Sequence, residues 1–429
     1  MYDLVVIGAG WAGYNAALRA KEIGLKVCLI EANQIGGTCL NYGCIPTKTL
    51  IQSAKIFSLV KKSAAFGIKL DNPRLDFVKI QDRKNKVIAQ LAQGMQSMLK
   101  GIDFIKSTAR VISAQEIEIQ SSKIDTKFIL IATGSQPVEL PDLKFDHQKI
   151  ISSNDALLLT EVPSSLLIIG GGVIGCEFAS LFSALGSQVT VAEKMPLLLF
   201  GEDKEISRKI EAVFNKKGIK VVTSAKIADF NPNNYSCVLV CAGREPNIRG
   251  LVLGNLGLKL ESNRIVVDDY LKTNIDSIYA AGDCVSSRML AHYAAYQGVT
   301  AVNNMFSDDW RKADNLIVPS CIFTEPQISS VGLNEEIASA RGIKIKIHRF
   351  DFRASAMAHV VDEAEGFIKV ISNQETGQVL GACMAGPLAS ELIAIPTLAI
   401  TAGLNIKQFQ ATIFAHPTFA ESIHKAINS

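Results

Sequence analysis

Two cysteines in a glycine-rich segment are the residues whose types and spacing most clearly indicate chemistry. Cys39 and Cys44 stand five positions apart in the segment Gly-Gly-Thr-Cys-Leu-Asn-Tyr-Gly-Cys-Ile-Pro-Thr-Lys, residues 36–48. Five residues of regular helix rise about 7.5 Å, whereas the α-carbons of a disulfide lie within about 7 Å of each other. Gly43 and Pro46 allow a bend followed by a helix, so we expect a turn that enters a helix start. A helix start favours a thiolate at Cys44, and the pair is therefore predicted to be redox-active.

Other interpretations of the two cysteines are buried free thiols or half of a metal site. No second pair of ligands at zinc spacing follows them, so we expect no metal site. The nine cysteines of the chain are an odd number scattered along 429 residues, which is unlike the disulfide framework of a secreted domain. We see no signal or transit peptide before the first strand and expect a cytoplasmic protein.

The chain contains two copies of one glycine pattern, each of which follows an apolar strand. The interval from the first glycine to an acidic residue, Glu31 or Glu193, is the same in both copies. In such a unit the first glycine makes a tight turn, the second lets a pyrophosphate approach the backbone, and the third lets the helix pack on the strand. The acid accepts hydrogen bonds from ribose hydroxyls. Two matched copies therefore predict two dinucleotide-binding units. Their glycines are Gly8, Gly10 and Gly13, and Gly170, Gly172 and Gly175.

The predicted fold class is α/β, with two Rossmann-like domains and a C-terminal α+β domain. Each unit ends with an apolar strand that runs into a glycine, at 128–134 and 238–243, and a third such strand at 278–283 indicates that the chain returns to the first sheet. After about residue 315, strand-like and helical segments alternate. These are strands at 342–350 and 366–371 and a helix at 389–404. The predicted domains are 1–145 with 269–313, 146–268, and 314–429.

Composition and charge exclude several classes of protein. Hydrophobic residues make up 48% of the chain and charged residues 20%, which is ample for large buried cores. The net charge is only +3, and no basic run or aromatic-rich basic stripe indicates binding to nucleic acid. Residues 166–185 are apolar enough for a membrane span, but a strand, a glycine turn and a buried helix explain them equally, and Glu177 would be costly in lipid. We therefore expect a globular protein without membrane insertion.

Over essentially the whole chain, these features resemble the flavoprotein disulfide reductases. The resemblance is greatest to the members that oxidise dihydrolipoyl groups with NAD. It implies an enzyme with FAD, a nicotinamide site, a redox-active disulfide and a C-terminal dimerisation domain. The stretches that carry it are residues 39–48, Ala132–Ser135, Ala281–Asp283, Met289–His292 and His416–Glu421.

The resemblance implies that the first unit binds FAD and the second binds NAD. Relatives that use NADPH commonly carry basic residues after the second strand to meet the extra phosphate, whereas this chain has Glu193 there and a complete third glycine, Gly175. A carboxylate repels a phosphate, so NAD is favoured over NADP. Asp283 is expected near the ribityl chain of FAD. Further cofactor-binding positions are Lys48, Thr133, Gly134, Gly243, Gly282, Leu290 and Ala291.

The two cysteines and one ion pair match catalytic positions of the family. Cys39 resembles the thiol that exchanges with the substrate, and Cys44 resembles the thiol that lies against the flavin. Lys48 and Glu177 resemble a buried ion pair near the reactive nitrogen of the flavin. Removing either partner would leave a buried charge and would cost about 3 to 5 kcal/mol in a dry site.

A histidine near the C-terminus matches the acid–base residue of the family. His416, oriented by Glu421, resembles the residue that works in the active site of the partner subunit, where a thiol must lose its proton before it exchanges. This implies a homodimer. Taken alone, His416 followed by Pro417 would be interpreted as a helix-entry residue. Only the cysteine pair supports its catalytic interpretation.

The predicted reaction is oxidation of the dihydrolipoyl group of an acyltransferase or carrier protein in a multienzyme complex, with a hydride passed through FAD to NAD. One alternative is an NAD(P)H-dependent reductase of a small disulfide or another acceptor. An alternative of another class is a catalytically silent flavoprotein scaffold subunit. Between Val222 and Val238 there is room for only a short connection where the family inserts a longer antiparallel excursion. We therefore expect a shortened second domain that retains NAD binding.

Overall fold

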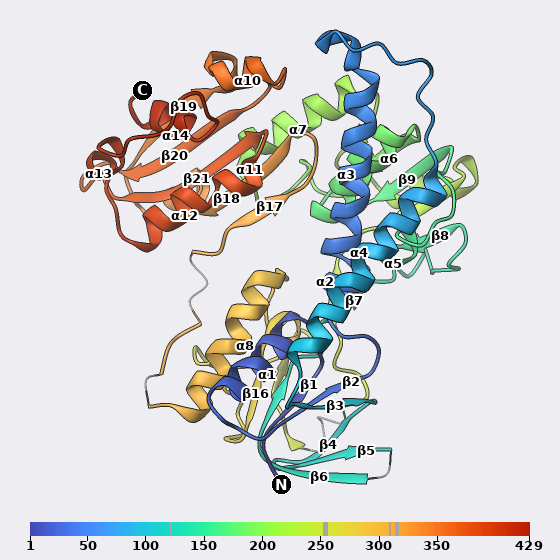
Figure 1. Ribbon diagram of the computed structural model, residues 1–429, viewed down its shortest axis with the longest axis vertical. Coiled ribbons are helices and arrows are strands. Elements are labelled where there is room, and N and C mark those ends of the chain that lie inside the picture. Colours follow the sequence, from blue (N-terminus) through green and yellow to red (C-terminus); the bar gives the residue numbers. More distant parts are fainter. Residues whose placement is uncertain (121, 252–255, 309, 314–316) are drawn as a thin grey trace.

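The computed structural model describes residues 1–120, 122–251, 256–308, 310–313 and 317–429. Three main sheets organise these residues, two built on parallel strands and one antiparallel (Figure 1). The predicted fold class is confirmed: two Rossmann-like α/β units are followed by a C-terminal unit with an antiparallel sheet. The predicted boundary at residue 314 lies outside the described residues.

The first sheet carries the first glycine pattern. Its strands are β1 (Tyr2–Ile7), β2 (Val27–Glu31), β3 (Asp103–Lys106), β4 (Arg110–Ser113), β5 (Glu116–Ile119), β6 (Ser122–Ile131) and β16 (Ile278–Ala280). Their order is β3-β2-β1-β6-β5-β4, with β16 beside β6. β1 is fully buried from Leu4 to Val6, as expected for a central parallel strand covered on both faces. β16 pairs in parallel with β6, so the chain returns to this sheet as the sequence indicated.

Small residues allow two helices of the first unit to pack closely. Helices α1 (Trp11–Glu22) and α8 (Ala291–Phe306) lie side by side (Figure 1). A Cβ on Gly298 of α8 would lie only 2.1 Å from the carbonyl oxygen of Ala12 in α1. The close contact therefore requires glycine at position 298, and it fixes the start of α1 beside the first glycine pattern.

The second sheet carries the second glycine pattern. Its strands are β8 (Ile150–Ser152), β9 (Ser165–Ile169), β10 (Gln188–Ala192), β11 (Lys220–Val222) and β12 (Cys237–Val240), and its helices are α5 (Ser153–Ala156), α6 (Val173–Leu185) and α7 (Lys204–Lys216). The order is β11-β10-β9-β12-β8, and every pair is parallel. The apolar residues 166–185 form β9 and α6, as predicted. Among the described residues, no helix combines the length and the apolar character needed to cross a membrane.

The connection between β11 and β12 is short, as the sequence predicted. Residues 223–236 are all described and contain only two single-turn 3₁₀ elements, η2 (Ile227–Asp229) and η3 (Pro232–Asn234). No strand forms between residues 223 and 236. The five parallel strands of the sheet are nevertheless complete around the glycine turn.

Three helices join the first unit to the second. They are α2 (Gly37–Tyr42), α3 (Cys44–Lys61) and α4 (Phe77–Met98). α3 packs against α4 and against α6 of the second unit (Figure 1). The start of α3 therefore lies where the two units meet.

The C-terminal unit is built on an antiparallel sheet. Its strands are β17 (Ser320–Ile322), β18 (Gln327–Gly332), β19 (Ile345–Asp351), β20 (Phe367–Asn373) and β21 (Val379–Gly386), in the order β17-β18-β21-β20-β19. The predicted strands at 342–350 and 366–371 are confirmed as β19 and β20. The helix predicted at 389–404 is divided into α11 (Ala389–Leu392) and α12 (Ala394–Thr401). The reason is Pro396, which has no N–H to donate to the carbonyl of Leu392 four residues earlier.

Short elements complete the chain. A two-stranded antiparallel sheet of β7 (Ser135–Pro137) and β13 (Arg244–Pro246) connects the ends of β6 and β12. The other short elements are η1 (Ser63–Phe66), β14 (Leu260–Glu261), β15 (Arg264–Ile265), η5 (Gly282–Cys284), α9 (Glu335–Ala340), η6 (Phe352–Ala354), α10 (Ala356–Val360), α13 (Ile406–Gln410) and α14 (Glu421–Ile427).

Candidate active site

The two cysteines lie on either side of a break between two helices. Cys39 is in α2, which ends at Tyr42, and Cys44 is the first residue of α3. Gly43 makes the break with φ −146° and ψ −109°. Both cysteines are free thiols in this structure, and their side chains are close enough for each to shift the pKa of the other. The bend places the two sulfurs together, which a continuous helix would not do.

The two thiols have opposite pKa shifts. The neighbouring Cys39 thiol lowers the pKa of Cys44 to about 7, against the effect of burial, and the charge of Lys48 lowers it further. The interaction with Cys44, together with burial, raises the pKa of Cys39 above its ordinary value. Near neutral pH the reduced pair therefore carries its negative charge on Cys44, while Cys39 keeps its proton.

Lys48 and Glu177 form an ion pair one helical turn beyond Cys44. The Nζ of Lys48 lies 2.8 Å from each carboxylate oxygen of Glu177, a residue of α6. Glu177 also accepts a hydrogen bond of 2.9 Å from the backbone N–H of Phe323, and the Lys48 ammonium lies 4.7 Å from the centre of the Phe323 ring. The Glu177 side chain is only 4% exposed, whereas that of Lys48 is 30% exposed. The pair thus ties α3, α6 and the segment before β18 together, with its cation facing the more open side.

The glycines of the two nucleotide units have matching surroundings. A Cβ on Gly8 would lie 2.4 Å from the carbonyl oxygen of Ala132, and a Cβ on Gly170 would lie 2.4 Å from that of Cys241. The third glycines pack equally tightly, because a Cβ on Gly13 or Gly175 would lie 1.9 Å from the carbonyl oxygen of the first glycine. Only glycine fits these positions.

The second glycines, by contrast, have open space beside them. A Cβ on Gly172 would meet nothing within 4 Å, and one on Gly10 would meet only the Cα of Gly37, at 4.0 Å. In each unit the backbone between the tight first and third glycines is therefore open to a pyrophosphate at the start of a helix.

The two acidic residues form the same hydrogen bonds. Glu31 accepts from the backbone N–H groups of Ala9 and Asn33, both at 2.7 Å. Glu193 accepts from those of Gly171 and Met195, at 2.5 and 2.6 Å. Each carboxylate is thus held at the end of the second strand by the residue after the first glycine. This repeated arrangement fits the ribose-binding position of a dinucleotide in both units.

The predicted FAD-binding positions in the middle of the chain lie around one buried carboxylate. Asp283 accepts a hydrogen bond of 2.6 Å from the Ser135 hydroxyl, and burial raises the pKa of its carboxyl group. The neighbouring Gly282 donates its N–H to Gln297 at 2.9 Å. The Thr133 hydroxyl is buried and has no hydrogen-bond partner among the described residues. A buried hydroxyl without a partner, two residues before the serine that binds the Asp283 carboxylate, fits a ligand rich in hydroxyl groups, such as the ribityl chain of FAD.

The other predicted positions also fall at helix or strand ends. Gly134 has φ +70° and follows Thr133, while Gly243 has φ +125° and lies just before β13. Leu290 is the residue that caps α8, and Ala291 is the first residue of that helix. All of these positions lie on turns or at a helix start, and the first N–H groups of a helix have no hydrogen-bond partner within that helix.

Arg244 is a residue of the site that sequence reasoning missed. Its guanidinium is largely buried and donates to the hydroxyl of Ser135 at 2.8 Å and to the Ser135 carbonyl at 2.7 Å. Burial lowers the pKa of Arg244, and the charges of Asp283 and Cys44 counteract this. Its position directly after Gly243, at the end of a strand, was the only available signal.

Trp11 was also missed. Its indole Nε1 is buried without a hydrogen-bond partner of good geometry among the described residues, and its proximity lowers the pKa of Cys39 against the larger effects that raise it. Trp11 begins α1, and Gly10 just before it packs against Gly37 at the start of α2. The first glycine pattern and the cysteine segment are therefore in direct contact.

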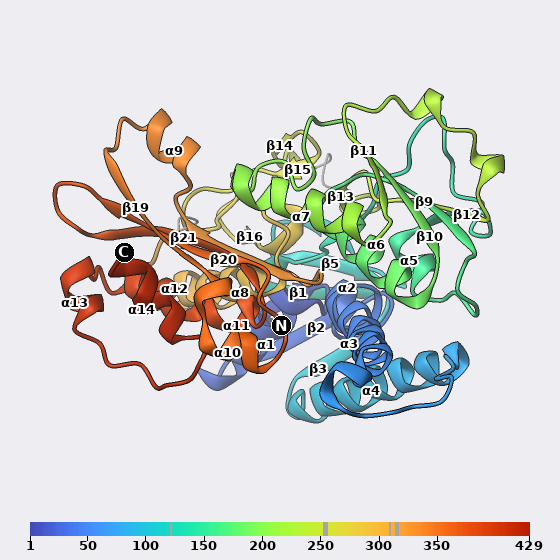
Figure 2. The same ribbon diagram turned by 90° about the horizontal axis from the view of Figure 1, so that it is seen from above.

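His416 and Glu421 form a pair at the start of α14. The Nδ1 of His416 lies 3.1 and 3.0 Å from the two carboxylate oxygens of Glu421, and this contact lowers the pKa of Glu421. The side chain of His416 is 68% exposed and that of Glu421 only 11%. Both views place α14 far from α2 (Figures 1 and 2). Within one chain the structure therefore does not bring His416 to the cysteine pair.

Two protein-family models match this architecture. Residues 2–298 match the model described as pyridine nucleotide-disulphide oxidoreductase, and residues 318–427 match its dimerisation domain. The chain belongs to this family. It is an oxidoreductase that uses FAD and NAD(H), and its C-terminal unit is a dimerisation domain.

Proteins with nearly the same length are similar throughout. A dihydrolipoyl dehydrogenase of Bacillus subtilis is 37% identical over 99% of this chain and 98% of the relative, and one of Chlamydia pneumoniae is 38% identical over 98% and 95%. Among solved structures, LpdA from Mycobacterium tuberculosis has a TM-score of 0.92 and 27% identity, covering 99% of both chains. The HOCl-induced flavoprotein disulfide reductase RclA from Escherichia coli has a TM-score of 0.89 and 29% identity, covering 100% of this chain and 99% of the other.

Proposed function

We propose that this chain is a dihydrolipoyl dehydrogenase that oxidises protein-bound dihydrolipoamide with NAD. The observation that carries the proposal is the pair of thiols at the start of α3, one of them acidic, between the first nucleotide unit and the Lys48–Glu177 ion pair. Several curated dihydrolipoyl dehydrogenases that are 33–38% identical over nearly the full length support it.

Thiol exchange at the cysteine pair is the step that the protein itself performs. One substrate thiolate attacks the sulfur of Cys39 in the Cys39–Cys44 disulfide, forming a mixed disulfide and releasing Cys44 as a thiolate. The second substrate thiol then attacks the first substrate sulfur, which is bonded to the sulfur of Cys39 in the mixed disulfide. This step closes the lipoyl disulfide and releases Cys39. Two electrons pass to the cysteine pair. Of the two substrate protons, one passes to Cys39 as it is released, and the other stays on His416 of the partner subunit. The low pKa of Cys44 favours its release, because a more acidic thiol is a better leaving group.

FAD bound to this site would supply the two-electron transfer between the dithiol and NAD. Gly8, Gly10, Gly13 and Glu31 would hold its adenosine diphosphate half, and Asp283 would accept from its ribityl hydroxyls. Lys48 would hold a positive charge beside the flavin. Thr133, Gly134, Gly282, Leu290 and Ala291 are the remaining positions that we assign to FAD.

Nicotinamide binding is assigned to the second unit. Gly170, Gly172 and Gly175 would receive the pyrophosphate, Glu193 would receive the ribose hydroxyls, and Gly243 lies at the end of the neighbouring strand. The domain limits that accompany this assignment are 1–145 with 269–313 for FAD, 146–268 for NAD and 314–429 for dimerisation.

Replacing Glu193 with arginine should shift the preference from NAD towards NADP by at least about tenfold in kcat/KM, because the carboxylate–phosphate repulsion is replaced by an attraction. The measurement is steady-state oxidation of dihydrolipoamide with each nucleotide. Glu202→Arg is a control that adds the same charge outside the glycine turn. An unaltered preference in Glu193→Arg would show that this carboxylate does not face the ribose.

The predicted partners are a second copy of the chain and a lipoyl-bearing protein. The match to a dimerisation domain and the exposed His416 support a homodimer, since this histidine and α14 lie far from α2 and the cysteine pair of their own chain (Figures 1 and 2). The lipoyl group would belong to an acyltransferase or carrier protein of a multienzyme complex. We expect this complex, and hence the enzyme, to be in the cytoplasm.

Steady-state oxidation of free dihydrolipoamide by the purified, FAD-loaded dimer tests the proposal. Turnover with NAD is expected, together with a preference for this direction over NAD(P)H-driven reduction of small disulfides or metal ions. Faster reduction of such acceptors, with little oxidation of dihydrolipoamide, would instead identify a reductase. Normal flavin content without any turnover would identify a scaffold subunit.

A further inference from the structure

Helix α7 faces the C-terminal unit through a row of ion pairs. Residues at both ends of the helix take part, so the row runs along its whole length. The pairs are Asp203–Lys369, Lys204–Glu336, Glu205–Arg349, Lys216–Glu365 and Lys217–Glu325, with N···O distances of 3.1, 3.0, 2.8, 2.5 and 3.0 Å. In each pair, one residue belongs to α7 or caps one of its ends, and the other belongs to the C-terminal unit. We call this boundary the α7 seam.

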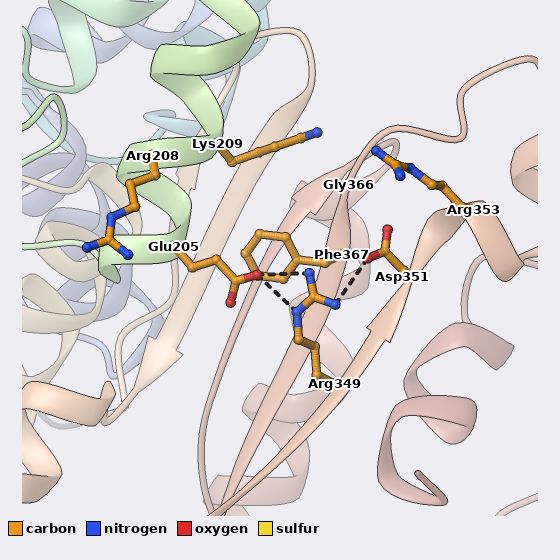
Figure 3. Close-up of a pocket in the computed structure, with 8 residues that line it drawn as sticks. All are labelled: Glu205, Arg208, Lys209, Arg349, Asp351, Arg353, Gly366 and Phe367. Carbon is orange, nitrogen blue, oxygen red and sulfur yellow. Dashed lines mark hydrogen bonds and ion pairs between the residues drawn. The ribbon is translucent and has the colours of Figure 1, made fainter.

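The middle of the α7 seam is hollow and positively charged. A cavity of about 310 Å³ opens there, lined by Glu205, Arg208, Lys209, Arg349, Asp351, Arg353, Gly366 and Phe367. Figure 3 shows Lys209 extending from α7 and Arg353 extending from the opposite unit, so that their charged ends face each other across the cavity. Two like charges that face each other repel unless an anion lies between them.

The carboxylates of the cavity are already engaged. Arg349 is held by Glu205 at 2.8 Å on one side and by Asp351 at 3.0 Å on the other, above the ring of Phe367. Glu365 lies outside the cavity lining and forms its ion pair with Lys216. This contact, together with the charges of Lys209 and Arg353, lowers the pKa of its carboxyl group. Within the described part of the chain, no carboxylate forms an ion pair with Arg208, Lys209 or Arg353.

Four cations and two carboxylates line the cavity, which leaves two positive charges in excess. A phosphate monoester carries about −1.5 to −2 at neutral pH and has three acceptor oxygens. We propose that this cavity binds a small phosphate ester whose phosphoryl group lies between Lys209 and Arg353. The guanidinium suits bidentate contacts with phosphate, and the lysine supplies a point charge. A volume of about 310 Å³ is at the lower end for ligand sites and admits a sugar phosphate rather than a dinucleotide.

A ligand in this position would add a link between α7 and the C-terminal unit. It would bridge the shortened nucleotide-binding unit to the dimerisation unit at a place along the α7 seam where Lys209 and Arg353 form no ion pair with a carboxylate of the described residues. The inference depends only on the fold and on the charges of the cavity residues, so its test is independent of the proposed reaction.

Isothermal titration calorimetry tests the proposal. The FAD-loaded dimer is titrated without NAD, at a constant ionic strength set with sodium chloride. The probes are ribose 5-phosphate, inorganic phosphate and uncharged ribose. Saturable binding of ribose 5-phosphate is expected, with no binding of ribose. Lys209→Gln and Arg353→Gln should each weaken it at least about tenfold, because each removes one charged contact to the dianion. Equal affinity for inorganic phosphate would mean that the site recognises the free anion, whereas tighter binding of the ester would mean that the sugar contributes.

The matched control is Lys204→Gln, which removes a lysine of the same helix outside the cavity. Its affinity for ribose 5-phosphate should equal that of the unaltered protein. A thermal-melting series adds a second measurement, since the ligand should raise the melting temperature of the unaltered dimer and of Lys204→Gln but not of the Lys209→Gln/Arg353→Gln protein. Binding that is equally strong in that double variant, or no saturable binding to the unaltered dimer, would overturn the proposal.

Discussion

Cys44→Ser should lack the long-wavelength charge-transfer band that appears when the enzyme takes up two electrons. The band requires a thiolate in contact with the oxidised flavin, and Cys44 is the thiol whose pKa is lowered, to about 7. Dihydrolipoamide oxidation should fall by at least about a thousandfold, because covalent exchange has no second sulfur to release. Anaerobic reduction with one equivalent of dithionite, followed by an absorption spectrum, is the measurement.

The matched variant is Cys39→Ser, which removes the other sulfur of the pair. It should lose dithiol oxidation as fully, yet keep a charge-transfer band without prior reduction, because Cys44 remains a free thiol. The band of the reduced, unaltered enzyme should titrate, rising as the pH increases through about 7 and disappearing on acidification as Cys44 gains a proton. A band that persists in Cys44→Ser and disappears in Cys39→Ser would reverse the two roles.

Local patterns predicted the bend between the two cysteines and the helix start at Cys44, because this backbone geometry depends on a short segment. Gly43 and Pro46 stand within seven residues of Cys39, and they were sufficient to predict a bend followed by a helix that begins near Cys44. The two nucleotide units could also be predicted from local sequence. Each requires a glycine turn, a helix packed closely on its strand and an acidic residue within one continuous strand–helix–strand unit. The chain's return to the first sheet through β16 could also be inferred, because its apolar strand ends in a glycine as the earlier ones do.

Contacts between distant residues could not be derived in this way. Lys48 and Glu177 are separated by 129 residues, and Arg244 and Thr38, 3.5 Å apart, by 206. The first pair was predicted only from the family resemblance, and the second was missed. Such pairings follow from how α3, α6 and the β7–β13 ladder pack against one another, and no local pattern encodes that packing. The ion pairs along α7 were missed for the same reason.

His416→Gln should slow dihydrolipoamide oxidation by about 10²- to 10⁴-fold, the usual contribution of a general base. NADH oxidation by an artificial acceptor should change by less than about twofold, because that reaction transfers no thiol proton. The control is His424→Gln, which alters a histidine within α14 whose Nε2 lies 3.0 Å from the carbonyl oxygen of Gln410. Equal losses in both reactions would argue against a thiol base at position 416.

A mixed dimer decides in which active site His416 works. Subunits carrying Cys44→Ser and His416→Gln, each with a different affinity tag, are co-expressed and the heterodimer is purified through both tags. If His416 serves the partner's cysteines, one of the two sites is intact and the other carries both changes, so about half of the normal activity is expected. If His416 served its own chain, both sites would be defective. The 68% exposure of His416 and its separation from α2 within one chain favour the first result, and an inactive heterodimer made of folded, flavin-loaded subunits would contradict it.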